Sequence, residues 1–127
     1  DIDLFNYLEE KLIYLDRNEF SANFHLKFLL DLSKYLGFYP DDSDSHLPFF
    51  NLEEGQFTTT ESSSTVISGS ILSLFKNLLI TDYPSLNQIK TNKNERNTLL
   101  HQLLKYYEWH FPNFKKVKSL EVLQVLF

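Results

Sequence analysis

The feature that most constrains this fold is an apolar stretch near residues 20–36, where hydrophobic side chains surround almost the whole circumference of a predicted helix. Only Lys27, Asp31 and Lys34 form a polar stripe on it, at spacings of four and three residues. Because a helix that is apolar nearly all round must be buried on most sides, we expect it to be the central helix of the domain. Gly37 can adopt the left-handed conformation that ends a helix, and Pro40 prevents continuation.

Helical patterns occupy most of the remaining chain. Apolar residues recur at helical spacing over residues 5–15 and again over residues 67–79. Asn92 and Glu95 have the spacing of a capping box, so a further helix is expected to begin there. Ser119 is suitable as the cap of a last, short helix.

The middle of the chain interrupts this pattern. Residues 49–57 (FFNLEEGQF) are too short and broken for a helix, and Gly55 indicates a tight turn, as in a small hairpin. A polar loop at residues 41–45 precedes it, and a Ser/Thr-rich linker at residues 58–65 follows it. We therefore predict a single all-α domain over residues 1–127, a compact bundle of about five helices with a small hairpin-like insertion near 49–57.

Several classes of function lack the residues that they need. The chain has no Cys, which excludes disulfides and thiolate metal sites, and its three glycines form no phosphate-binding run. No apolar run approaches the length of a membrane span. We therefore expect no enzyme activity, no cofactor, no bound metal and no membrane association. The histidines are too dispersed for a helical zinc site: His25, His46, His101 and His110.

Charge is distributed unevenly along the chain. The first 86 residues carry five basic and fourteen acidic side chains, whereas the rest carry seven basic and three acidic ones. A group of lysines, proposed to contact DNA, lies among aromatic residues of the last third, a pattern suited to phosphates and bases or to an acidic peptide with an aromatic end. The same pattern also arises when the rings are core and the lysines only solubilise the surface. These lysines are Lys105, Lys115, Lys116 and Lys118.

Four segments in this order resemble a known family: ANFHLKFLLDLSKYLGFYP, FFNLEEGQF, ERNTLLHQLLKYYEWHFPNF and KSLEVLQVLF. Together they are similar to the C-terminal helical domain of the bacterial recombination mediator RecO, in its Bacteroidetes-type form. The resemblance implies a non-catalytic protein that helps load RecA onto single-stranded DNA coated by single-strand-binding protein and that anneals complementary strands. It implies a cytoplasmic, nucleoid-associated location.

The resemblance also implies the partners. An N-terminal OB-fold would bind DNA and RecR, and the helical domain would add DNA contacts and dock the acidic, Phe-ended tail of single-strand-binding protein. The OB-fold is absent from this chain, which we interpret as a piece of a longer protein. This piece alone is expected to bind single- and double-stranded DNA weakly. Many members also carry a four-cysteine zinc site where this chain has residues 41–57, so apolar packing is expected to hold that turn, through Phe49, Phe50, Leu52 and Phe57.

Two surfaces are candidates for the tail. One is a groove along the Lys27 and Lys34 stripe, bordered by Phe24, Phe28 and Tyr35, and it is favoured because a groove buries more of a ring. The other lies at the end of the Asn92 helix and its linker, around Tyr107, Phe111, Lys115 and Lys116. The alternative function is a helical protein–protein adaptor that has no contact with nucleic acid.

The absence of thiolates and the dispersed histidines predict that the purified protein holds no stoichiometric metal. Elemental analysis of the purified chain checks this. One zinc per chain would contradict the prediction.

Overall fold

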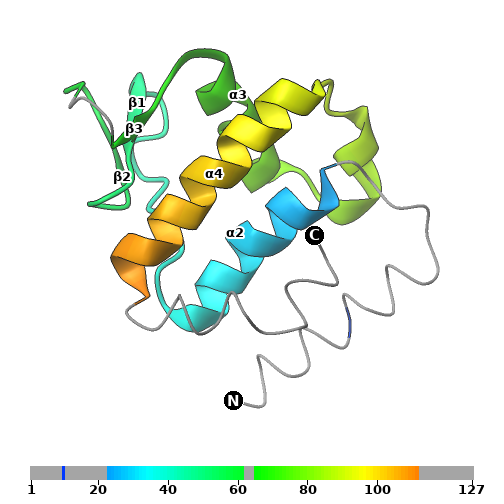
Figure 1. The fold of residues 1–127 in the computed structure, drawn as a ribbon, viewed down its shortest axis with the longest axis horizontal. Helices are drawn as coiled ribbons and strands as arrows, with labels where there is room; N and C mark the ends of the chain where they lie inside the picture. Colours follow the sequence, from blue (N-terminus) through cyan, green and yellow to red (C-terminus); the bar gives the residue numbers. More distant parts are fainter. Residues whose placement is uncertain (1–9, 11–22, 62–64, 112–127) are drawn as a thin grey trace.

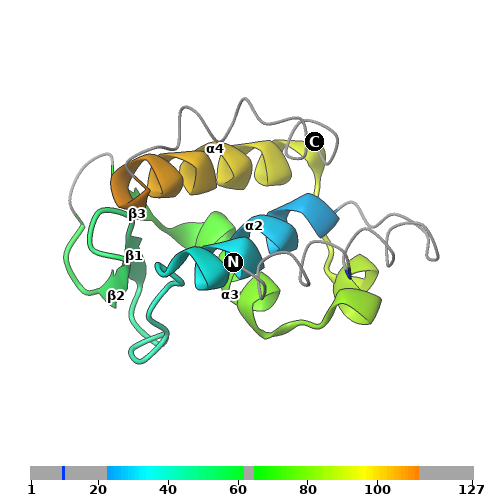
Figure 2. The same ribbon diagram turned by 90° about the horizontal axis from the view of Figure 1, so that it is seen from below.

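A computed structural model describes residue 10, residues 23–61 and residues 65–111. Figure 1 shows α2 and α4 side by side, with the strands at one end of the helices and η1 at the other. In Figure 2, α4 lies in a layer over α2 and α3. The helix expected over residues 5–15, apart from residue 10, and the helix expected from Ser119 lie outside the described residues, as does part of the 58–65 linker. In chain order the elements are α2 (Phe24–Leu36), β1 (Phe49–Asn51), β2 (Gln56–Thr58), β3 (Val66–Ile67), α3 (Gly69–Ile80), the 3-10 helix η1 (Tyr83–Gln88) and α4 (Lys93–His110).

Helix α2 is the buried central helix that its sequence predicts. It ends as expected, because Gly37 has a φ of 95° and the Phe38 amide donates to the Ser33 carbonyl at 2.9 Å. Helices α3 and α4 and the 3-10 helix η1 all contact it. Its fully or nearly fully buried apolar side chains are Phe24, Leu26, Phe28, Leu29, Leu30 and Leu32.

The prediction of an all-α fold is wrong, because the structure contains a three-stranded antiparallel sheet in the order β2-β1-β3. The hairpin near 49–57 is present: Phe50 pairs with Phe57 across β1 and β2, and Gly55 turns the chain with a φ of 70°. On its other side, β1 pairs with β3, where Phe50 is opposite Ile67. The domain is therefore mixed α and β.

Strand β3 was missed for a physical reason. It has only two residues, too few for an alternating pattern to be visible, and Ile67 continues the apolar spacing of the helix that follows. Helix α3 begins only at Gly69, so Ile67 belongs to the sheet and not to the helix. Its side chain is fully buried, which explains why it resembled a core-facing helical residue.

Aromatic packing joins the sheet to the helices. The Phe50 ring lies 5.0 Å from Phe57, 4.7 Å from Phe75 of α3 and 5.9 Å from Tyr106 of α4, measured between ring centroids. The loop before the hairpin is also attached, since the Asp41 amide donates to the Gly55 carbonyl at 2.9 Å. Phe50, Leu52 and Phe57 are buried, as expected for a turn that apolar packing stabilises, and Phe49 is half-buried.

Helix α4 begins with the capping box that the sequence predicts. The Asn92 side chain accepts from the Glu95 amide at 2.8 Å, and the Glu95 carboxylate accepts from the Asn92 amide at 3.1 Å. These two hydrogen bonds fix the first turn of α4. The short helix before it, η1, has Pro84 near its own start.

Burial of α2 predicts a large loss of stability when its apolar side chains are shortened. Leu29→Ala should lower the free energy of unfolding by about 2–5 kcal/mol, because the cavity adds to the lost apolar burial. Chemical denaturation measures this. The exposed Lys34 of the same helix provides the control, and an equal loss for Lys34→Ala would contradict the placement of Leu29.

Candidate partner-binding surfaces

The groove predicted along α2 is interrupted at Lys27. Only 7% of Lys27 is exposed, and its ammonium donates to the Leu78 carbonyl at 2.8 Å and lies 3.7 Å from the Asp31 carboxylate. Phe24 and Phe28 are buried as well, so the expectation that they border an open groove is not met. Lys34 is exposed and Tyr35 is 38% exposed, which leaves the open part of the stripe at the C-terminal end of α2.

The position of Lys27 follows from the end of α3. Leu78 lies in the last turn of that helix, where carbonyl oxygens have no amide partner within the helix. A Lys side chain can bury its methylene groups against apolar neighbours and place its ammonium on such a carbonyl, where the helix dipole also favours a positive charge. The sequence signal was ambiguous, because a buried capping lysine and a solvated one have the same spacing.

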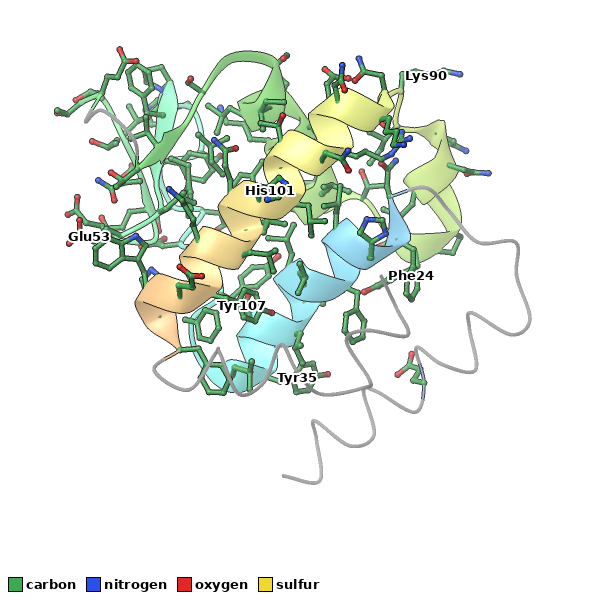
Figure 3. All side chains as sticks on the ribbon, viewed as in Figure 1. Phe24, Tyr35, Glu53, Lys90, His101 and Tyr107 are labelled. Atoms are coloured by element: carbon green, nitrogen blue, oxygen red, sulfur yellow. The ribbon has the colours of Figure 1, made fainter. Side chains whose placement is uncertain are left out.

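The second predicted surface, at the end of α4, is also less accessible than expected. Tyr106 and Tyr107 are buried; the Tyr106 hydroxyl donates to the Phe38 carbonyl and the Tyr107 hydroxyl to the Leu29 carbonyl, the latter at 2.6 Å. Burial raises the pKa of both phenols well above the usual range, so both remain donors. Figure 3 shows Tyr107 between α4 and α2. Phe111 is half-buried against Phe38, with ring centroids 6.2 Å apart.

Lys105 is the one proposed DNA-contacting lysine within the described residues, and it is exposed. Lys115, Lys116 and Lys118 lie outside them, so their surroundings are not described. Lys105 borders a hollow of about 360 Å³ between the last turns of α4 and the sheet. The same hollow contains Trp109, 53% of which is exposed. Its full lining is Leu52, Thr65, Lys105, Glu108 and Trp109.

A basic end, which sequence analysis did not single out, lies where η1 meets α4. Lys90, Lys93 and Arg96 lie within seven positions of one another, and Lys90 and Lys93 are exposed. Arg96 donates to the Thr91 hydroxyl at 2.7 Å. Burial, followed by the charge of Arg96, lowers the pKa of His25, so this imidazole adds no charge to the basic end near neutral pH.

Two adjoining hollows open at this basic end. A hollow of about 290 Å³ is lined by polar and basic side chains and by Ile89, and a larger one of about 610 Å³ shares Ile89 and Lys90 with it. The larger hollow includes Ile80, 81% of which is exposed, the most exposed large apolar side chain of the described residues. Cations therefore lie beside accessible aliphatic surface. The residues that line the smaller hollow are Asn23, Asn87, Ile89, Lys90, Thr91 and Arg96.

Acidic side chains gather at the opposite end. Glu53 and Glu54 occupy the hairpin turn, and the loop bonded to Gly55 carries three exposed aspartates. Figure 3 shows Glu53 and Lys90 at opposite ends of the molecule. The uneven distribution of charge along the sequence is therefore also a separation of basic and acidic side chains in space. The aspartates are Asp41, Asp42 and Asp44.

The described residues lack two further kinds of feature, a cluster of metal-ligating side chains and a membrane-spanning helix. They contain no group of three or more His, Asp or Glu side chains placed to hold a metal ion. None of their helices has the length and apolar character needed to cross a membrane. His110 is explained by packing, because its Nε2 lies 2.7 Å from the Leu52 carbonyl and its ring stacks on Phe38.

The fold and surfaces define a small mixed α and β domain with one basic and one acidic end. Residues 1–121 match the family model described as Recombination protein O C terminal, and the chain belongs to this family. It is similar to "DNA repair protein RecO" of Christiangramia forsetii, with 46% identity covering 98% of this chain and 52% of the relative. No solved structure matched significantly.

Further relatives agree in name and coverage. The "DNA repair protein RecO" of Flavobacterium psychrophilum is 42% identical, over 97% of this chain and 51% of the relative. That of Bacteroides fragilis is 35% identical, over 98% of this chain and 53% of the relative. The chain therefore spans about half the length of the curated relatives that it matches.

The contact between Lys27 and Leu78 predicts a stability effect that distinguishes two lysines of one helix. Lys27→Met keeps the aliphatic stem but leaves the Leu78 carbonyl without its charged donor, so stability should fall by about 1.5–3 kcal/mol. Lys34→Met, at an exposed position, should change it by about 0.5 kcal/mol or less. Urea denaturation of both variants measures the difference, and equal effects would refute the structural role of Lys27.

Proposed function

We propose that this chain is the C-terminal domain of a recombination mediator in DNA repair, and that it acts without catalysis. In this role it docks the acidic tail of single-strand-binding protein and assists DNA binding, strand annealing and RecA loading. RecR would bind through the remainder of the longer protein. The observation that carries the proposal is the match of residues 1–121 to the Recombination protein O C-terminal family.

The basic end is the surface that best suits an acidic tail with an apolar end. Carboxylates of the tail would pair with Lys90 and Arg96, which line the smaller hollow without any acidic neighbour in that lining. The terminal ring of the tail would cover Ile80 and Ile89 in the adjoining hollow, where Lys90 offsets the charge of Asp82 in the same lining. Clusters of basic side chains are a recurring means of recognising acidic motifs, and burial of a ring in an adjoining apolar hollow would add to the affinity.

The α2 stripe is a weaker candidate than its sequence suggested. Lys27 is committed to Leu78 and Asp31, so only Lys34 and Tyr35 are open there. These two residues remain proposed as a secondary contact for the tail. The DNA contacts of the domain remain proposed at Lys105, Lys115, Lys116 and Lys118.

A second candidate function is a protein–protein adaptor that makes no contact with nucleic acid. The formal net charge of −5 and the exposed acidic end favour it, because both repel phosphates. Measuring DNA binding as a function of salt separates the two functions. Phosphate contacts give a steep decrease of affinity on a logarithmic scale, whereas an adaptor gives no binding that salt can weaken.

Docking at the basic end predicts that a charge reversal there weakens binding of a synthetic acidic peptide ending in Phe. Lys90→Glu should raise the dissociation constant several-fold, since it replaces an attraction by a repulsion. Ile80→Ser should raise it up to about tenfold by removing aliphatic surface from the ring. Isothermal titration calorimetry measures both, and the same peptide without its final Phe is the control ligand.

Matched variants elsewhere decide between the surfaces. Lys105→Glu carries the same charge change at another position and should leave peptide affinity nearly unchanged, whereas Lys34→Glu, at the proposed secondary contact, should weaken binding less than Lys90→Glu does. A loss restricted to Lys34→Glu would move the site to the open end of α2, and a loss restricted to Lys105→Glu would move it to the end of α4. If the unmodified chain does not bind the peptide, the docking function proposed for it fails.

A further inference from the structure

The hollow at the end of α4 combines three kinds of side chain. Lys105 and Trp109 are one helical turn apart, so they share one face of α4, and Glu108 stands at the same rim. About half of the Trp109 surface is exposed, although Tyr106 and Tyr107 of the same helix are buried. Within the described part of the chain, neither Lys105 nor Glu108 has an ion-pair partner.

Hydrogen bonds fix the side of the hollow that lies opposite α4. The Leu52 amide donates to the Thr65 carbonyl at 2.8 Å, which ties the hairpin turn to the segment before β3. The Leu52 carbonyl can only accept, so His110 donates to it from Nε2 at 2.7 Å and ties the same turn to α4. Gly55 lies so close to α4 that an added Cβ would be 3.4 Å from the Tyr106 hydroxyl. The hollow is therefore pre-formed.

We infer that this hollow is a stacking site for one unpaired nucleotide of single-stranded nucleic acid. The base lies on the exposed face of the Trp109 indole, Lys105 pairs with the adjacent phosphate, and the Glu108 carboxylate accepts from a base N–H donor. This inference rests on the proposed function, because it assigns a specific position to the DNA contact of the domain.

The mixed charge of the rim selects a nucleotide over an acidic peptide. A nucleotide presents an anionic phosphate to Lys105 and neutral N–H donors to Glu108, so both charged side chains are complemented. An acidic tail would bring only carboxylates towards Glu108, which repels them. A base in a duplex has its faces covered by its neighbours and cannot lie on the indole, so the site requires an unpaired base.

Trp109 is the only tryptophan of the chain, which makes its fluorescence a reporter of this site. Titration of the unmodified chain with a short oligodeoxycytidylate should quench that fluorescence, because a stacked base contacts the indole directly. The same oligonucleotide in a pre-formed duplex should cause little quenching. Cytosine is chosen because its exocyclic amine supplies donors for Glu108.

Variants are measured by the anisotropy of a fluorescein-labelled oligodeoxycytidylate, which does not depend on tryptophan. Trp109→Leu should weaken binding by about five-fold to one hundred-fold, whereas Trp109→Phe should retain most of the affinity through its ring. Lys105→Glu should weaken binding and reduce its salt dependence by about one phosphate contact. Lys93→Glu, the same charge change at the other end of α4, is the matched control, and thermal melting verifies that each variant is folded.

The outcomes separate this inference from the proposed function. Absence of quenching, or equal affinities for Trp109→Leu and the unmodified chain, overturns the stacking site even when the acidic peptide still binds at the basic end. Quenching by the acidic peptide instead of the oligonucleotide also overturns it and assigns the hollow to a protein partner. If Trp109→Leu loses the oligonucleotide but keeps the peptide, the two ligands occupy separate surfaces, as inferred.

Discussion

The constraint on which this structure depends is the burial of most of α2. A helix surrounded by protein has no water to satisfy its polar groups, so each of them needs a partner inside the domain. Lys27 donates to the Leu78 carbonyl of α3, and the Leu29 carbonyl accepts from the Tyr107 hydroxyl of α4. These two bonds connect the central helix to both neighbouring helices and fix how α3 and α4 lie around it.

A network of polar side chains likewise connects the start of α2 to the neighbouring elements. Asn23 is 2% exposed, and its amide donates to the Leu86 carbonyl of η1 at 2.9 Å while its carbonyl oxygen accepts from the Thr91 hydroxyl at 3.2 Å. Arg96 completes the connection through Thr91. The basic end is therefore formed by the same contacts that anchor α2, so its cations are held on a rigid part of the domain.

The sequence predicted the elements whose signals are local. The apolar circumference of α2, its Gly37 end, the Gly55 turn and the Asn92 capping box each depend on residues a few positions apart, and each is found in the structure. Strand β3 depends on pairing with β1, which no local pattern of two residues can reveal. The fold class was wrong for this reason.

The candidate surfaces were harder to predict, because an amphipathic side chain has the same spacing in either role. Lys27 was assigned to an open stripe, but its stem is buried and its ammonium satisfies a helix end. Tyr107 was placed on a candidate docking surface, but its hydroxyl donates to the Leu29 carbonyl within the core. The basic end combines residues of α3, η1 and α4, and its hollows exist only after these elements pack together.

The distribution of charge determines how each surface has to work. Exposed charges are screened over about 10 Å at 0.1 M salt, so cations at the basic end act mainly on groups close to them. Lys105 lines the hollow near the hairpin, whose turn carries Glu53 and Glu54, so it would have to attract a phosphate against an acidic background. Stacking on Trp109 does not depend on net charge, and a single strand held there would owe most of its affinity to the ring. The smaller hollow of the basic end, which is lined by Lys90 and Arg96 and by no acid, suits a ligand recognised chiefly by its charge. The two ends of the domain would therefore favour chemically different ligands.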